Sequence, residues 1–172
     1  MIVSKIIDGN LITEASDSSR QLHNTGSYGT LLKNGQVKLS FLEGLYLVSI
    51  DKLKIYSGSK ELTFEQILRK GVKEEKGIYP RYIVYKDLRD RGYIVKTALK
   101  FGGDFRVYDK GIRPGDDHAK WVVFPVKESN VLTWYEFSAK NRVAHSTKKR
   151  LMLGIVDDEG DVTYYEVKWL RP

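Results

Sequence analysis

The three histidines are the first candidates for acid–base chemistry, because the sequence contains no cysteine. His118 follows an acidic run (residues 115–117) and directly precedes an expected strand, and loop positions of this kind often carry function. His145 lies in a segment rich in serine and lysine, whereas His23 lies in a polar N-terminal stretch and is expected at the surface. Taken one at a time, His118 and His145 fit a hydrogen-bonded structural role better than a catalytic one.

Several common catalytic and cofactor signatures are missing. Without cysteine there is no thiol nucleophile, no disulfide framework and no cysteine-ligated zinc or iron–sulfur site. The histidines show no zinc-binding spacing, and Gly102-Gly103 lacks the pattern of a phosphate-binding loop, so a turn is expected there. The lack of cysteine, of a signal peptide and of an apolar run near the ~18 residues of a membrane span predicts a reducing, cytoplasmic setting.

The charge of the chain predicts a polyanionic partner, with nucleic acid the first candidate. The 172 residues include 29 basic and 22 acidic side chains, which gives a net charge of +7 and a pI near 9.4. Residues 1–78 carry 11 basic and 9 acidic side chains (+2), and residues 79–172 carry 18 and 13 (+5). Residues 138–156 hold five basic side chains and no acid, although such a run is also typical of a solvated face.

Residues 1–78 are expected to form a small α+β domain. The segments 2–7 and 11–13 are apolar and flank Asp8-Gly9-Asn10, a turn sequence typical of a β-hairpin. Two helices are predicted where a serine or threonine is followed three residues later by glutamate or glutamine, which together form a capping box; these helices start at Ser40 and Thr63. The polar stretch 16–34 has little periodicity and is expected to be irregular.

Residues 79–172 alternate helices and strands more regularly. Pro80 suits the first turn of a helix that Gly92 ends in the left-handed conformation. The expected strands are residues 93–99, 105–108, 121–126, 151–156 and 162–167, with a helix over residues 132–140. This order predicts a mixed β-sheet flanked by helices. The break between Gly77 and Pro80 places the domain boundary after residue 78.

Three motifs follow one another in this second half: YKDLRDRGYIVKT at residues 85–97, KFGGDFRVY at 100–108 and RVAHSTKK at 142–149. In this order they resemble the archaeal tRNA-splicing endonucleases, also called tRNA intron endonucleases. The resemblance is close over residues 79–172 and weaker over the two N-terminal helices. It implies a restriction-endonuclease-like catalytic domain preceded by an N-terminal domain that supports assembly.

The resemblance also implies a catalytic triad that needs no metal or other cofactor. By motif, the triad is Tyr108, His118 and Lys149, with Lys148 as the alternative if the register differs by one; His145 is expected to support the local structure. Such a triad would cut RNA through the neighbouring 2′-hydroxyl, with a base, an acid and a cation. A free tyrosine is only about one part in a thousand ionised at pH 7, so a nearby lysine would favour the phenolate.

The implied substrate is precursor tRNA, cut at bulge–helix–bulge intron boundaries. Arg142 is expected to grip a bulged base, and Tyr164 is the candidate for a second planar contact, since guanidinium and aromatic rings both stack on bases. The acidic loop 157–161 and the last strand, 162–169, are expected to join subunits in a homo-oligomer or a hetero-tetramer with a second endonuclease subunit.

Three alternatives stay open at this point. The chain could be a non-catalytic RNA-binding or structural subunit of the same assembly. It could be a metal-dependent nuclease in which Asp104 and a nearby lysine hold Mg²⁺, although Asp104 fits the turn before a strand better. It could also be an RNA-binding module without any catalytic role.

Overall fold

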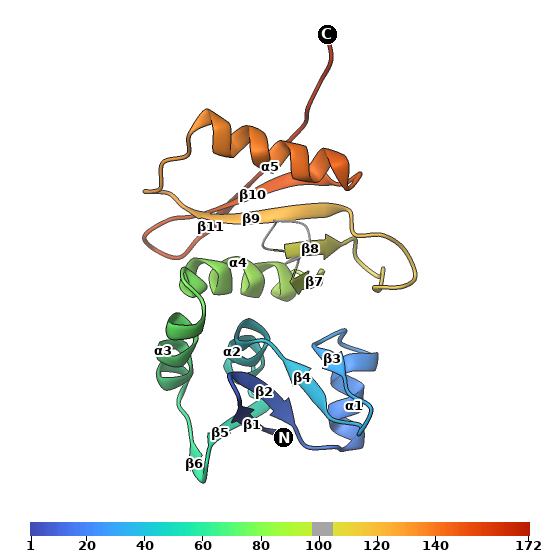
Figure 1. The fold of residues 1–172 in the computed structure, drawn as a ribbon, viewed down its shortest axis with the longest axis vertical. Coiled ribbons are helices and arrows are strands. Elements are labelled where there is room, and N and C mark those ends of the chain that lie inside the picture. Colours follow the sequence, from blue (N-terminus) through green and yellow to red (C-terminus); the bar gives the residue numbers. More distant parts are fainter. Residues whose placement is uncertain (98–104) are drawn as a thin grey trace. The chain divides into compact units, whose positions relative to one another are not determined.

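The computed structural model describes residues 1–97 and 105–172, which form two compact units, Met1–Tyr82 and Ile83–Pro172 (Figure 1). Along the chain, the division between the units falls within one helix. The predicted division after residue 78 and the assembly role of the N-terminal domain stay predictions. The elements up to this helix are β1 (Ile2–Ile7), β2 (Asn10–Thr13), α1 (Asp17–Asn24), β3 (Thr30–Leu31), β4 (Val37–Leu39), α2 (Phe41–Ser49), β5 (Leu53–Ser57), β6 (Lys60–Glu61), α3 (Phe64–Glu74) and α4 (Ile78–Asp90).

The N-terminal unit is built on a six-stranded sheet with the order β3-β4-β2-β1-β5-β6. The predicted hairpin is confirmed: β1 and β2 pair antiparallel, and Asp8 and Gly9 take positive φ angles of 48° and 73° between them. Two successive positive φ angles are typical of the tightest hairpin turn. On its other side β1 pairs with β5 in parallel, so α2 is the crossover that joins β4 to β5.

Both predicted N-terminal helices begin at capping boxes, as expected. The Ser40 hydroxyl accepts from the Glu43 amide while the Glu43 carboxylate accepts from the Ser40 amide, and Thr63 and Gln66 repeat this arrangement at α3. Helix α2 lies very close to the sheet at Gly44, where any Cβ would collide with the side chain of Leu11. Glycine is therefore required at this contact.

The expectation of irregular structure over residues 16–34 is wrong for its first part, because Asp17–Asn24 form helix α1. The Ser16 hydroxyl caps this helix by accepting from the Ser19 amide at 3.1 Å. Few of its side chains are apolar, so periodicity does not reveal it. His23 lies in its last turn, half-buried, with its ring Nδ1 at 3.1 Å from the Tyr28 carbonyl oxygen, rather than in a loop at the surface.

The C-terminal unit contains the predicted mixed sheet, with the order β11-β10-β9-β8-β7. Strands β9 and β10 pair in parallel and the other neighbours pair antiparallel. Its elements after α4 are β7 (Ile94–Thr97), β8 (Phe105–Tyr108), β9 (Trp121–Lys127), α5 (Trp134–Ser146), β10 (Arg150–Val156) and β11 (Val162–Val167). The strand predicted over 93–99 is described as far as Thr97, and the Gly102-Gly103 turn and Asp104 lie outside the described residues.

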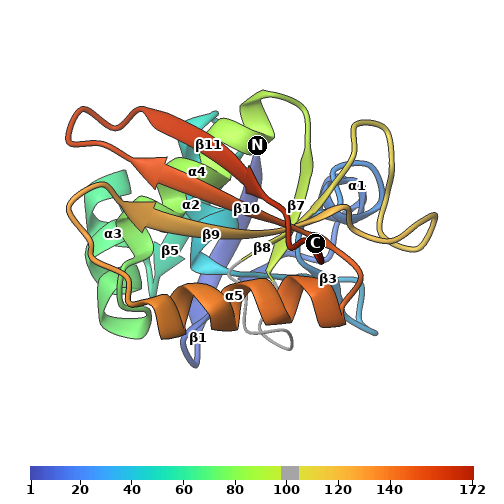
Figure 2. The same ribbon diagram turned by 90° about the horizontal axis from the view of Figure 1, so that it is seen from above.

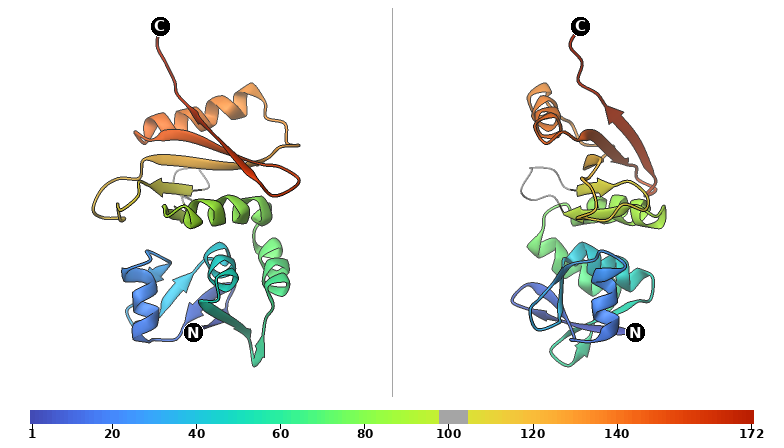
Figure 3. Two further views of the ribbon diagram at one scale, coloured as in Figure 1. Left: turned by 180° about the vertical axis from the view of Figure 1, so that it is seen from behind. Right: turned by 90° about the vertical axis from the view of Figure 1, so that its right-hand side faces the viewer.

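Helices cover both faces of this sheet (Figures 1 and 3). On one face, Ala144 of α5 packs with Val122 and Phe124 of β9, and α5 runs along the sheet lengthwise (Figure 2). On the other face, the Tyr85 ring of α4 lies 5.8 Å from the ring of Phe105. The predicted helix over 132–140 begins two residues later, because Thr133 caps it with Glu136 as the partner. It also continues further than predicted, through Ser146. In the described part of the chain, no helix is long and apolar enough to cross a membrane.

Candidate active-site cleft

Tyr108 is the last residue of an interior strand. Strand β8 pairs with β7 on one side, where Tyr108 faces Ile94, and with β9 on the other, where Arg106 faces Val122. Side chains two residues apart on a strand point to the same face, so Arg106 and Tyr108 share the face that carries Val122 and α5. Tyr108 is buried, with 5% of its surface exposed.

His118 is presented by a loop whose two ends are tied together. At its base, the Lys120 ammonium donates to the Asp109 carboxylate at 2.8 Å, and the Lys120 amide donates to the Val107 carbonyl at 2.9 Å. The bond from Lys120 holds the pKa of the Asp109 carboxyl below its usual range. The His118 amide donates to the Asp117 carboxylate at 2.6 Å, and the imidazole is exposed. The loop therefore offers a solvent-accessible imidazole from an anchored base.

Lys149 takes its position from the way α5 ends. Lys148 adopts the left-handed conformation, with φ of 54°, and its amide donates to the His145 carbonyl at 3.1 Å. The Lys149 amide donates to the Ala144 carbonyl at 2.9 Å, which completes the two hydrogen bonds of a Schellman motif. The Lys149 ammonium donates to the Thr147 carbonyl at 3.1 Å, at the negative end of the helix dipole.

These three segments meet at one cleft of about 360 Å³. Tyr108, His118 and Lys149 all line it, and Lys149, rather than Lys148, is the lysine that does so. The remaining lining residues are Arg106, Gly115, Asp116, Asp117 and Ala119. Arg106 is not among the site residues predicted from the sequence. The signal that could have found it is its two-residue spacing from Tyr108 on a predicted strand.

The cleft combines side chains suited to a phosphodiester. Lys149 and Arg106 supply cations that can approach phosphate oxygens, and guanidinium groups bind phosphate in a bidentate manner. The phenol of Tyr108 and the imidazole of His118 can each exchange a proton. Within residues 1–97 and 105–172, no group of three acidic or histidine side chains is arranged to hold a metal ion.

Arg142 lies elsewhere, on the exposed side of α5. Its guanidinium lies 5.9 Å from the centre of the Tyr135 ring, and it lines a groove of about 790 Å³ with Phe137, His145 and Trp169. The rings of His145 and Trp169 lie 4.6 Å apart, so His145 contacts the C-terminal segment. Neither Arg142 nor His145 lines the cleft, although His145 and Lys149 share a smaller pocket of about 250 Å³.

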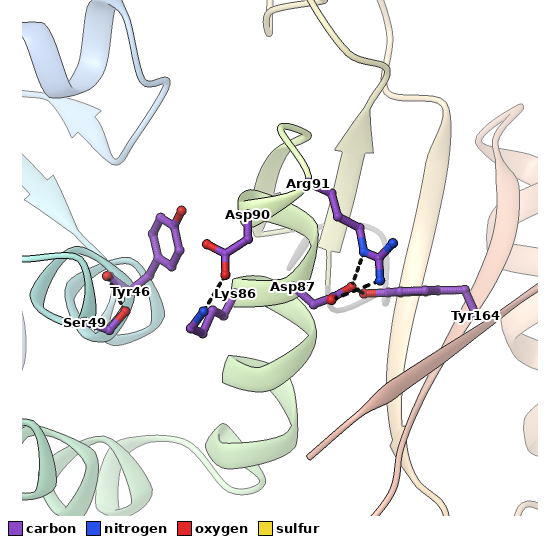
Figure 4. A network of polar contacts seen from close by, with 7 residues as sticks. All are labelled: Tyr46, Ser49, Lys86, Asp87, Asp90, Arg91 and Tyr164. Carbon is purple, nitrogen blue, oxygen red and sulfur yellow. Dashed lines mark hydrogen bonds and ion pairs between the residues drawn. The ribbon is translucent and has the colours of Figure 1, made fainter. Parts of the chain in front are cut away.

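Tyr164 lies away from both the cleft and the groove, on β11, and its side chain points toward Asp87 of α4 (Figure 4). Its hydroxyl donates to the Asp87 carboxylate at 2.8 Å, and burial, with this hydrogen bond, raises the pKa of Tyr164. The Arg91 guanidinium donates to the same carboxylate at 2.8 Å and lies 6.0 Å from the centre of the Tyr164 ring. The phenol end of Tyr164 is therefore engaged by α4.

Comparison with known proteins gives consistent matches along the chain. Residues 4–68 match the family described as tRNA intron endonuclease, N-terminal domain, and residues 78–164 match the tRNA intron endonuclease, catalytic C-terminal domain. The chain is 39% identical over 167 residues to a tRNA-splicing endonuclease of Thermococcus onnurineus, covering 97% of this chain and 95% of that protein. It is 42% identical over 159 residues to the protein of that name from Pyrococcus furiosus, covering 92% and 91%. The Nanoarchaeum equitans protein of that name is 45% identical over 141 residues, covering 78% of this chain and 90% of the relative.

Proposed function

The chain belongs to the tRNA intron endonuclease family, and we propose that its C-terminal cleft cuts precursor tRNA at bulge–helix–bulge intron boundaries without a metal ion. Membership makes the protein a tRNA-splicing endoribonuclease, and the proposal concerns how the cut is made. One observation supports it above the others: Tyr108, His118 and Lys149 come from three separate segments and line one cleft.

The proposed reaction is an internal transesterification. Tyr108 removes the proton from the 2′-hydroxyl next to the scissile phosphate, and the new O2′–P bond forms as the P–O5′ bond breaks. His118 gives a proton to the departing 5′-oxygen. Lys149 stabilises the negative charge of the phosphorane between these steps and favours the phenolate of Tyr108. The products carry a 2′,3′-cyclic phosphate and a 5′-hydroxyl.

Three substitutions test these roles. Tyr108→Phe keeps the ring and removes one oxygen, and we expect it to lower the single-turnover cutting rate by about 10²- to 10⁴-fold, as we expect of His118→Ala. Lys149→Ala should cost about 10²- to 10³-fold. Binding of precursor tRNA should stay within a few-fold of the wild type in all three.

Lys148→Ala is the matched control, since Lys148 adjoins Lys149 in sequence and is exposed outside the cleft. It should cut at the wild-type rate. A larger loss from Lys148→Ala than from Lys149→Ala would refute the assignment of the lysine. Parallel losses of binding and cutting in the triad variants would favour a non-catalytic RNA-binding role.

The chemistry of the products tests the transesterification itself. A precursor with a 2′-deoxynucleotide at the scissile position should bind and resist cutting, because it lacks the nucleophile. The normal precursor should yield cyclic phosphate ends in the presence of EDTA. Cutting that stops with EDTA and returns with Mg²⁺, or cutting of the 2′-deoxy precursor, would instead indicate a metal-dependent nuclease.

Arg142 and Tyr164 are proposed to contact bulged bases. The support for Arg142 is its exposure in a groove that also contains the rings of Phe137 and Trp169, which offer stacking surfaces. Tyr164 is half-buried, and its hydroxyl is bound to α4, so only its ring would be offered to RNA. Arg142→Ala should raise the KM for precursor tRNA with little effect on kcat, measured under multiple-turnover conditions.

The assembly is proposed to be a homo-oligomer or a hetero-tetramer with a second endonuclease subunit, joined through β11 and the acidic loop Asp157–Asp161. Strand β11 is an edge of its sheet, and Trp169 and Leu170 beyond it are 56% and 74% exposed. The Asp157 carboxylate accepts from the Glu159 and Asp161 amides, which shapes the loop and turns other acidic side chains outward. Native mass measurement of the chain, alone and with candidate partners, tests this proposal.

A further inference from the structure

A basic groove lies within the N-terminal unit, along α3. It has a volume of about 380 Å³ and is bounded by α3 and by the hairpin of β5 and β6. Its lining residues are Ser57, Lys60, Leu62, Gln66, Arg69, Lys70 and Lys73. Four of these seven side chains are cations, one is apolar, and none is a carboxylate.

The cations of α3 form a stripe because of the way this helix packs. Ile67 and Gly71 are buried on one side of α3. Positions 66, 69, 70 and 73 have the i, i+3, i+4, i+7 spacing of a neighbouring face, and Gln66 fixes the start of the helix through its capping box. The three cations of the stripe, Arg69, Lys70 and Lys73, span about 6 Å along the helix axis.

The lysines of this stripe are not neutralised by acidic side chains of the described chain. Lys60, Lys70 and Lys73 are exposed, and none of them forms an ion pair with any residue in 1–97 or 105–172. Arg69 lies one turn after Glu65, whose pKa is held below its usual range mainly by hydrogen bonds to its own backbone amide and to the Thr63 side chain, with a smaller contribution from the charge of Arg69. The groove therefore presents excess positive charge to solvent.

We propose that this groove binds the phosphate backbone of the RNA substrate, as a second contact made by the N-terminal unit. The proposal rests on the function proposed above for the identity of the RNA. Three cations within about 6 Å along the helix, with Lys60 also lining the groove, fit a few successive phosphates of one strand, whose charges recur every few ångströms. A protein partner is disfavoured because Leu62 is the one apolar side chain in the lining, and protein interfaces need a buried apolar centre.

The test compares two triple variants that remove equal charge from the same unit. The first variant combines Arg69→Ala, Lys70→Ala and Lys73→Ala, which removes all three cations of the stripe. Lys33→Ala, Lys38→Ala and Lys52→Ala remove three exposed cations that do not line the groove. Affinity for full-length precursor tRNA is measured by filter binding from 50 to 200 mM KCl, in the Tyr108→Phe background so that the RNA stays intact.

If three phosphate contacts are lost, the dependence of affinity on salt should become shallower by about 2 to 3 in a plot of log Kd against log salt. Across this fourfold range of salt, the affinity of the parent protein should therefore fall about 16- to 64-fold more than that of the stripe variant. The control triple should retain a slope closer to that of the parent. In the cutting-competent background the stripe variant should raise KM and keep kcat.

Two results would overturn the proposal. Equal salt slopes for the two triple variants would make the stripe an ordinary solvated face. A stripe variant whose native mass falls while the control's does not would show that the groove receives another subunit, such as an acidic loop of a second copy. Failure of the function proposed above is distinguishable, because the Tyr108→Phe protein would then still bind the RNA in a groove-dependent manner, while the wild-type chain would yield no cyclic phosphate ends.

Discussion

Replacing Lys148 with glycine should stabilise the C-terminal unit without reducing cutting. Lys148 has a φ of 54°, a left-handed conformation that brings Cβ too close to the following carbonyl oxygen in any residue except glycine. The conformation is required, since it lets the amides of Lys148 and Lys149 reach the carbonyls of His145 and Ala144 and end α5. A glycine satisfies the same two hydrogen bonds without the steric cost.

The size of the effect follows from two opposing terms. A side chain in the left-handed region costs about 1–2 kcal/mol. Glycine gains more conformational freedom in the unfolded chain, which offsets about 0.5–1 kcal/mol of that relief. The expected net stabilisation is about 0.5–1 kcal/mol. With a urea dependence of about 2 kcal/mol per molar, the unfolding midpoint should rise by about 0.25–0.5 M.

The assay is urea unfolding of a series at position 148. Lys148→Ala removes the same charge as Lys148→Gly but keeps Cβ, so the difference between them isolates the backbone conformation. Lys148→Val adds a branched Cβ that the left-handed region tolerates poorly, which predicts the order Gly above Lys and Ala, and Val last. An alanine variant as stable as the glycine variant would refute the reasoning. The cutting rate of Lys148→Gly should match the wild type, because the backbone that positions Lys149 is unchanged.

Three further outcomes are expected. Tyr164→Phe removes the hydroxyl that donates to Asp87 and should lower the free energy of unfolding, measured in urea, by about 1.5 kcal/mol. The affinity for precursor tRNA should stay unchanged because the ring remains, and a loss of affinity would contradict a stacking role. The hydrogen bond from the Trp121 indole lowers the pKa of Glu166, so its stabilising contribution is complete above the unfolded pKa of about 4.3 and is lost as the pH falls through the lower folded value. Glu166→Gln should therefore flatten the loss of stability below about pH 4.3, and urea midpoints from pH 3 to 6 that fall as steeply as in the wild type would count against this. Trp169→Asp should reduce the native mass of the assembly with little change in unfolding midpoint, whereas an unchanged mass would remove this residue from the interface.

Local signals in the sequence predicted much of the fold. Three of these signals are the capping boxes at Ser40 and Thr63 and the turn at Asp8-Gly9-Asn10. In each, the residues that form the hydrogen bonds lie within a few positions of one another, so a short segment is enough to predict the structure. Helix α1 was missed because its local signals are weak. Only the Ser16 hydroxyl caps its start, and few of its residues are apolar. The end of α5 was placed too early because its last turns expose polar side chains that break the expected spacing.

The sequence predicted some of the site residues and missed others. The motifs nominated Tyr108, His118 and Lys149, and their spacing also left Lys148 open as the lysine. Side-chain type and motif order supply such candidates, yet they do not place the residues relative to one another. Arg106 was not predicted, because the residues next to it in the sequence do not distinguish a strand arginine that lines a cleft from one that faces solvent.

By itself, the sequence determined the family, the order of helices and strands and the side chains available for catalysis, since these follow from residue type and short spacings. The tertiary structure decided which of them meet. Pairing of β8 with β9 turned Arg106 and Tyr108 toward the face of α5, and the left-handed turn at Lys148 brought Lys149 to the cleft. The turn at Lys148 is made by local hydrogen bonds, but its place beside Tyr108 depends on the packing of α5 on the sheet and on the pairing of Phe105 with Val123, which no local pattern encodes.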